Sequence, residues 1–239
     1  KTDSSKIRVS QSEMGGGFGG KTSFYAEPVA IVLAKKARRP VKIVLTRNEV
    51  FRCTGPVAAS KSRIKMGATK DGRIVAAESE LVFQCGVYSG SGHVNGAQAI
   101  FTRYALDNVH TISREVVSNR PKVNAFRAPC VPQIVFGVEA LVSEMANKVG
   151  MDQIDFRLKN AAKEGDTTVF GQTFERIGFV ETLEAAKQTD HYKSKLPEGW
   201  GRGVSTGFWF NRDGDTTGSL TITPGGSVTI MVGTSDVAG

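Results

Sequence analysis

The chain has 239 residues, of which 40% are hydrophobic and 23% charged, and its formal net charge is +8. This length suffices for one large or two modest domains with a buried core, and the composition is ordinary for a globular protein. No apolar run approaches the roughly 20 residues of a membrane-spanning helix, so we expect no membrane span. The basic residues are dispersed except at 35–39, without interleaved aromatics, so we expect no binding to nucleic acid.

The first half of the chain is predicted to consist mainly of strands around one helix. Alternating apolar and polar residues predict a strand at 7–13, and a glycine-rich run follows it. A helix is predicted within 23–39, and its apolar stretch "PVAIVLA" suits a buried helix. Three further strand segments are predicted, at 41–46, in a long hairpin over 62–89 with its turn at 70–73, and at 109–118.

The second half begins with helices and returns to strands. Val135, Val138, Leu141, Val142 and Met145 form one apolar stripe of a helix that ends near Gly150, a residue typical of helix C-termini. Two shorter helices and three strands are predicted after it, at 152–162 with Asp152 as N-cap, at 179–189, and at 202–210, 219–223 and 227–233.

These elements indicate an α+β fold with mixed and antiparallel sheets and packed helices. We divide the chain into a first portion at 1–131, which holds the glycine-rich run and the long hairpin, and a second portion at 132–239. The second portion leads from helices into a β-rich segment, which we expect to be truncated at the C-terminus.

The cysteines and histidines do not form a metal or disulfide pattern. Cys53, Cys85 and Cys130 form no C-x-x-C pair, and the three histidines are far apart. Few cysteines favour a reducing compartment, so we expect the cytoplasm. The chain opens at Lys1 without an initiator methionine or signal peptide, which leaves the periplasm as the alternative if a targeting segment precedes it.

The run "MGGGFGGKTS" at 14–23 formally matches both a P-loop and a dinucleotide fingerprint. A P-loop needs a buried apolar strand before it and a second strand that ends in a magnesium-binding aspartate, and the sequence has neither. The dinucleotide interpretation is retained as a minor alternative, an NADP-binding dehydrogenase in which Arg47 meets the 2′-phosphate. Such clustered glycines favour a backbone that approaches a ligand closely, and a purely structural loop is the alternative.

A second stretch, "NAFRAPCVPQIVFGVEALVSEMANKVGMDQIDFRLKN" at 124–160, adds to this run. The two together resemble the molybdopterin-binding (large) subunit of the xanthine dehydrogenase and aldehyde oxidase family of molybdenum hydroxylases. In that family a G-G-x-F-G-x-K loop is followed by A-[FY]-R-x, a helix and a D-x-x-x-x-R-x-x-N element. The likeness continues into "GWGRGVSTGF" at 199–208, so the chain resembles a central fragment of that subunit with its molybdopterin-binding fold.

The resemblance implies a molybdenum–pyranopterin cofactor, as molybdopterin or its cytosine dinucleotide, with no residue of this chain coordinating the metal directly. It assigns cofactor binding to Gly16, Gly17, Phe18, Gly19, Arg127 and Ala238. It places Thr22, Pro129 and Phe208 in the substrate pocket. The structural alternatives are a hydrophobic plug for Phe18, a solvated surface cation for Arg127 and simple packing for Phe208.

Several residues depart from the family pattern. Thr22 stands where purine-oxidising members have a glutamate, which argues against xanthine as substrate. Ala128 replaces the copper-binding cysteine of carbon monoxide oxidisers, and Pro129 replaces a stacking aromatic. Ala238 stands where a cofactor-loop glutamine is expected, and the general-base glutamate is expected beyond Gly239, so no catalytic residue is expected in this chain.

The resemblance implies an oxidoreductase that hydroxylates an aldehyde or N-heteroaromatic carbon of a small molecule, with water as the oxygen source. Electrons are expected to pass to iron–sulfur clusters and FAD on partner chains or segments, because this chain has no iron–sulfur cysteine motif. The remaining parts of the molybdopterin subunit are expected as partners, and the fragment alone is expected to be inactive. The alternative function is a cofactor-free binding or assembly domain of the same fold, to which Thr22 and Ala238 point.

Overall fold

The structure is a computed structural model that describes residues 2–10, 13–210 and 215–233. Its contacts divide the chain into two compact units, one formed by Lys1–Lys42 with Arg212–Gly239 and the other by Ile43–Asn211. The division proposed from the sequence falls inside the second unit and remains a prediction. Among the described helices, none is both long and apolar enough to cross a membrane.

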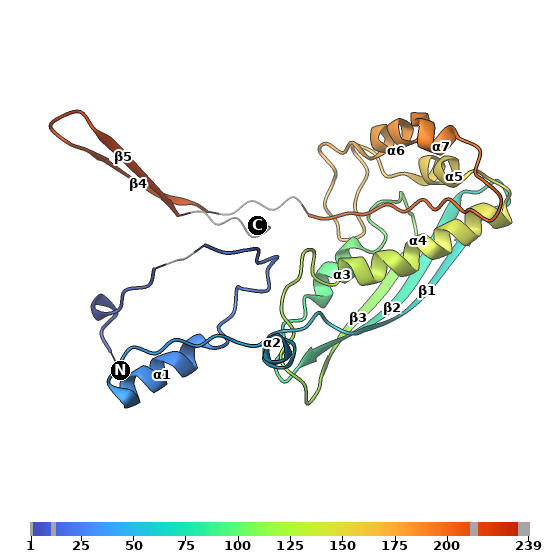
Figure 1. Ribbon diagram of the computed structural model, residues 1–239. Helices are drawn as coiled ribbons and strands as arrows, with labels where there is room; N and C mark the ends of the chain where they lie inside the picture. The colour runs from blue at the N-terminus through green and yellow to red at the C-terminus, as the bar shows by residue number, and fades with distance from the viewer. Residues whose placement is uncertain (1, 11–12, 211–214, 234–239) are drawn as a thin grey trace. The chain divides into compact units, whose positions relative to one another are not determined.

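The larger unit is built on a three-stranded sheet in the order β1-β2-β3 (Figure 1). β1 (Ser60–Ala68) and β2 (Ile74–Gly86) are antiparallel, with Ser60 opposite Phe83, and form the predicted hairpin. β3 (Val109–Val117) pairs with β2 in the parallel sense. The mixed sheet confirms the predicted fold class.

The hairpin turn lies where the sequence predicts it. The Thr69 amide donates to the Arg73 carbonyl over 2.9 Å, and the Gly72 amide donates to the Thr69 carbonyl over 2.9 Å. Gly72 has a φ of 85°, a left-handed conformation that glycine adopts without steric cost. The Gly in "KDGR" therefore fixes the position of the turn.

The helices of the larger unit include all three that the apolar periodicity predicts. These are α4 (Val131–Lys148), α5 (Gln153–Asn160) and α6 (Phe179–Gln188). The structure adds three short helices that the sequence analysis did not predict, α2 (Arg47–Cys53), α3 (His93–Ala99) and α7 (Asp190–Lys193).

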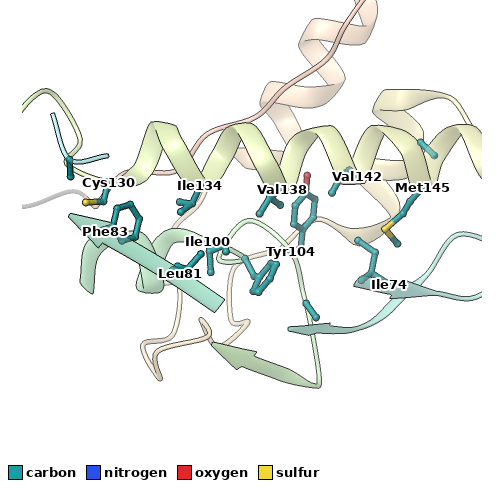
Figure 2. Packing of buried hydrophobic residues seen from close by; sticks show 14 of the residues in the cluster. Ile74, Leu81, Phe83, Ile100, Tyr104, Cys130, Ile134, Val138, Val142 and Met145 are labelled. Atoms are coloured by element: carbon teal, nitrogen blue, oxygen red, sulfur yellow. The ribbon is translucent and has the colours of Figure 1, made fainter. Parts of the chain in front are cut away.

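The core lies between α4 and the sheet, as Figure 2 shows. Ile134, Val138 and Val142 of α4 face Leu81 and Phe83 of β2, and all five are at most 1% exposed. Val138, Val142 and Met145 of the predicted stripe are buried, whereas Val135 and Leu141 are partly buried at its margin. Burial of such side chains contributes about 1.5–3 kcal/mol each, so this layer stabilises the larger unit.

The smaller unit contains α1 (Glu27–Ala37) and an antiparallel hairpin of β4 (Thr217–Ile222) and β5 (Val228–Gly233), after a 3₁₀ turn at Ser4–Lys6. These helix and strand predictions are confirmed. The expectation that the apolar run in α1 is buried is wrong, because no residue of this helix is buried.

Three predicted strands do not form among the residues that the structure describes. The described residues of 7–13 have no strand partner. Alternation of apolar and polar side chains does not by itself form a strand, because the backbone also needs hydrogen-bond partners. The segment 41–46 is not a strand because Thr46 caps α2: its hydroxyl accepts from the Glu49 amide and the Glu49 carboxylate accepts from the Thr46 amide. The segment 202–210 is extended without sheet pairing, because buried side chains bind its backbone instead.

The D-x-x-x-x-R-x-x-N element is structural. Asp152 accepts hydrogen bonds from the amides of Ile154 and Asp155 and so caps α5, as predicted. Asn160, at the end of α5, accepts from the Ile74 amide over 2.7 Å and donates to the Gly72 carbonyl over 2.9 Å. Its side chain therefore fastens α5 to the hairpin turn.

Replacing Asn160 by Ala is expected to destabilise the protein by about 3 kcal/mol, because the change leaves the buried Ile74 amide and Gly72 carbonyl without partners. Urea unfolding measures this difference. Asn147→Ala is the matched control, since Asn147 is exposed and accepts one hydrogen bond from Gln153; its expected effect is within about 0.5 kcal/mol. Equal effects of the two substitutions would contradict the structural role of Asn160.

Candidate functional site

The glycine-rich run forms a tight loop whose glycines have distinct roles. The Gly20 amide donates to the Gly17 carbonyl over 2.7 Å. Gly16 has a φ of 120°, and a Cβ at this position would lie 2.8 Å from Cε2 of Phe18, so the ring of Phe18 folds over a position that only glycine fits. Gly15, in contrast, has open space around it.

Phe18 and Gly19 form the strained tip of this loop. Phe18 has a φ of 52°, a conformation that is uncommon for a residue with a side chain, and Gly19 has a φ of 87°. The amides of Phe18 and Gly19 have no hydrogen-bond partner within the described part of the chain. Strain of this kind and unpaired amides are typical of loops that bind an anion or a polar ligand edge.

The surroundings of the loop differ from those of phosphate-binding folds. The described residues before the loop form no strand, and α1 begins only at Glu27. Between the loop and α1, the Thr22 hydroxyl donates to the Gly19 carbonyl and the Tyr25 hydroxyl donates to the Gly20 carbonyl. A P-loop or dinucleotide site needs a strand before the loop and a helix that starts at it. The NADP-binding alternative therefore lacks its structural basis.

Arg127 lies in a strained turn just before α4. Ala128 and Cys130 have φ values of 62° and 67°, and the Val131 amide donates to the Ala128 carbonyl over 3.0 Å. Arg127 is exposed and forms no ion pair within the described residues, so its guanidinium is available to an anion. Pro129 is half-buried behind it.

A loop that the sequence analysis did not single out supports this turn. The Cys130 thiol donates to the Ser91 carbonyl over 3.1 Å, and a Cβ on Gly92 would lie 3.1 Å from Cβ of Pro129. The Glu115 carboxylate accepts from the amides of Gly90 and Ser91. The glycines and serines of "SGSGH" at 89–93 are the only sequence signal for this packing.

Burial and hydrogen bonding set the ionisation of this region. Burial raises the pKa of the Cys130 thiol to about 12, and the Glu115 carboxylate adds to the effect. Burial would also raise the pKa of Glu115, but the hydrogen bonds from Ser91 and Gly90 outweigh it and lower that pKa. Cys130 is therefore a neutral thiol near pH 7 and a poor metal ligand.

Phe208 lines a cavity of about 930 Å³ in the larger unit. Its ring lies 6.2 Å from that of Phe174 and 5.3 Å from that of Phe210, both in edge-to-face contacts. Two buried polar atoms of residues that line this cavity, Nε of Arg103 and Oγ1 of Thr206, have no hydrogen-bond partner in the described part of the chain. A wall that combines aromatic side chains with polar residues is typical of small-molecule sites.

A buried ionic network lies beside this cavity. The Glu139 carboxylate of α4 accepts from Nη2 of Arg103 over 3.2 Å, Nε of Arg157 over 3.0 Å and the hydroxyl of Tyr104 over 2.6 Å. The side chains of Glu139, Arg103 and Arg157 are at most 3% exposed. Burial opposes ionisation of Glu139, but Arg103, Tyr104 and Arg157 outweigh it and hold its pKa below the ordinary range.

The candidate residues fall into separate groups. Gly16, Gly17, Phe18, Gly19 and Thr22 share the glycine loop of the smaller unit, and Arg127 and Pro129 share one turn of the larger unit. Phe208 lines a cavity whose wall includes neither of the latter two residues. Ala238 lies outside the described residues. No group of three His, Cys, Asp or Glu side chains suited to a metal ion occurs among the described residues.

Glu139 makes the stability of the protein sensitive to acid. Because its folded-state pKa is lowered, its ionic network contributes fully above about pH 4.3 and is lost as the pH falls through the folded-state value. Glu139→Gln is expected to cost about 3 kcal/mol at pH 7, since it leaves two buried guanidinium groups without a counter-charge. Urea unfolding from pH 7 down to about pH 2 should show this difference shrink in acid, whereas parallel pH profiles would contradict the assignment.

Comparison of the chain with protein families and known proteins finds matches among molybdopterin-binding proteins. The family described as molybdopterin cofactor-binding domain matches residues 1–161. The chain is 34% identical over 193 residues to the nicotinate dehydrogenase large molybdopterin subunit of Eubacterium barkeri, covering 77% of this chain and 44% of that protein. It is 32% identical over 206 residues to the aldehyde oxidoreductase of Megalodesulfovibrio gigas, covering 82% of this chain and 23% of that protein.

Solved structures of related oxidoreductases share the fold of this chain. The aldehyde oxidoreductase from Desulfovibrio gigas superposes with a TM-score of 0.76 at 28% identity, over 91% of this chain and 25% of that one. The CO dehydrogenase from Oligotropha carboxidovorans shares the fold, with a TM-score of 0.73 at 20% identity over 95% of this chain and 33% of that one. The chain thus spans less than half the length of the relatives named here.

Proposed function

The chain belongs to the molybdopterin cofactor-binding domain family, and from this premise we propose that it supplies cofactor-binding and substrate-wall residues of a molybdenum hydroxylase. The proposed substrates are aldehydes or N-heteroaromatic compounds, and the proposed oxygen source is water. The observation that carries the proposal is the loop at 14–23, where Gly16 is sterically required and two amides at the tip are unpaired.

The residues of this loop fit a flat anionic cofactor. The absence of side chains at Gly16, Gly17 and Gly19 lets the backbone approach a ligand closely, and the free amides of Phe18 and Gly19 are suited to a ligand oxygen. Arg127 has no ion-pair partner in the described part of the chain, and its planar guanidinium suits a second anionic edge. We propose that these residues, with Ala238, hold a molybdenum–pyranopterin as molybdopterin or its cytosine dinucleotide.

Once bound, this cofactor supplies the two-electron oxidation that places a water-derived oxygen on the substrate carbon. The chain's own residues would exclude water from the substrate and orient it. Phe208 and its aromatic neighbours offer an apolar wall for this purpose. Thr22 supplies no carboxylate, which favours an aldehyde or a simple heteroaromatic over a purine. Ala128 stands where carbon monoxide oxidisers have a copper-binding cysteine, which disfavours a copper site.

The complete enzyme would need further polypeptide. The hairpin of β4 and β5 has one apolar face, on which every side chain is more than half exposed; it consists of Leu220, Ile222, Val228, Ile230 and Val232. Exposed apolar faces of this kind support a partner, and we propose the remaining parts of the molybdopterin subunit. Iron–sulfur and FAD modules on other chains or segments would then carry the electrons. We also propose a cytoplasmic location, with the periplasm as its alternative.

A cofactor-free assembly domain is the second candidate. The Thr22 hydroxyl bonds to the Gly19 carbonyl within the loop rather than facing a ligand, which favours a structural role for this residue.

Gly16→Ala in the full protein, produced with its partner subunits and the cofactor-maturation machinery, is expected to reduce retained molybdenum about tenfold after gel filtration. The φ of 120° at Gly16 is strained for alanine, and the added Cβ would also displace the Phe18 ring. Gly15→Ala is the matched control, because the added Cβ meets nothing within 4 Å, and it should retain molybdenum at the wild-type level.

Benzaldehyde and quinoline, incubated with the wild-type enzyme in ¹⁸O-labelled water, should yield labelled products.

Equal molybdenum retention in both variants would refute the role of the loop. Unlabelled products, or no turnover by molybdenum-loaded protein, would refute the proposed reaction.

A further inference from the structure

We infer that Glu139 and Arg157 are positioning residues that fix the aromatic wall at 208–210 through the backbone of the segment before it. The inference about the segment rests on the described hydrogen bonds, and its consequence for substrate binding rests on the proposed function. Neither residue lines the cavity, so their effect on a ligand would be indirect.

The segment at 202–206 has an unusual anchorage. It is extended but pairs with no strand in the described part of the chain. Its hydrogen bonds go instead to buried side chains: the Thr206 amide donates to Oε2 of Glu139 over 2.9 Å, and Nη2 of Arg157 donates to the Val204 carbonyl over 2.8 Å. Both bonds involve a charged group, which makes them stronger than ordinary backbone hydrogen bonds.

A second anchor fixes the start of the segment. Nη1 of Arg202 donates to the Tyr192 carbonyl over 2.6 Å, and Nη2 donates to the Ser194 carbonyl over 3.0 Å. Arg202 is thus bonded to the C-terminal end of α7, and Val204 and Thr206 are bonded to α5 and α4. These bonds fix the direction in which the chain runs toward Phe208.

The extended backbone carries this constraint to the aromatic residues. Side chains in an extended segment alternate between two faces, and residues 204, 206, 208 and 210 are half-buried while 203, 205, 207 and 209 are exposed. Phe208 therefore lies on the same face as Thr206, two residues beyond the bond to Glu139. A shift of the anchored backbone moves Phe208 relative to Phe174 and Phe170, which belong to a different loop of the cavity wall.

The network itself holds Glu139 and Arg157 in place. Arg157 also donates to the carbonyls of Gln153 and Glu139 and to the Ser143 hydroxyl. The bond to the Glu139 carboxylate leaves from Nε of Arg157, whereas the bonds to Ser143 and Val204 leave from Nη2. A lysine retains the charge, but its single nitrogen cannot occupy both positions.

Arg157→Lys tests this role by hydrogen–deuterium exchange of the complete protein. The Thr206 amide, which donates to Glu139, should exchange about 10- to 100-fold faster than in the wild type, relative to amides of α4 in the same molecule. Ser143→Ala is the control: it removes one partner of Arg157 but touches neither the segment nor the cavity, and exchange of the Thr206 amide should stay at the wild-type rate relative to α4. In the loaded enzyme, Arg157→Lys should raise KM for an aromatic aldehyde about tenfold with kcat within twofold.

Unchanged exchange of the Thr206 amide in Arg157→Lys, or acceleration only in proportion to α4, would overturn the positioning role. If Arg157→Lys does not fold, exchange of the wild type decides: the Thr206 amide should be protected nearly as strongly as α4, and exchange at the rate of an open chain would overturn the inference. A selective change in exchange together with unchanged KM of the loaded enzyme would retain the anchorage and refute its link to substrate binding. The exchange measurement needs no molybdenum, so it tests the anchorage separately from the proposed function.

Discussion

The buried carboxylate of Glu139 is the interaction on which the larger unit depends. It lies on the apolar face of α4 and joins Arg103 and Tyr104, which follow α3, to Arg157 of α5 and to the backbone of Thr206. Burying an ion pair costs desolvation energy, and the cost is offset here because the carboxylate has four donors. The same carboxylate thus holds together two helices, the segment after α3 and an extended segment that has no sheet to support it.

Local patterns in the sequence were sufficient for the elements whose hydrogen bonds are local. The long hairpin follows from its alternation and from Gly72, and α4 and α5 follow from apolar periodicity and from the Asp152 cap. The predictions at 41–46 and 202–210 failed because side chains decide those backbones: Glu49 with Thr46 in one case, Glu139 with Arg157 in the other. A single glutamate within the apolar stripe of α4 was the available signal for the buried network, but its partners are remote in sequence.

For the candidate site, too, some features could be predicted from the sequence and others only from the structure. Resemblance to a family was enough to select the glycine loop, Arg127 and Phe208, but only coordinates distinguish Gly16, where a side chain collides with Phe18, from Gly15, where it does not. The support of the Arg127 turn by Ser91 and Glu115 depends on contacts across the sheet and could not be predicted from spacing. Family membership, the strained loop with unpaired amides and the unpaired arginine together support a cofactor-binding role.

The most direct test of this account is analysis of molybdenum and pterin in the full-length protein, purified anaerobically from its native host with its partner subunits. The account predicts about one molybdenum per chain and a fluorescent oxidised pterin. A folded, full-length preparation that lacks molybdenum although the maturation machinery is present would contradict it, and the glycine loop would then be a structural feature of an assembly domain.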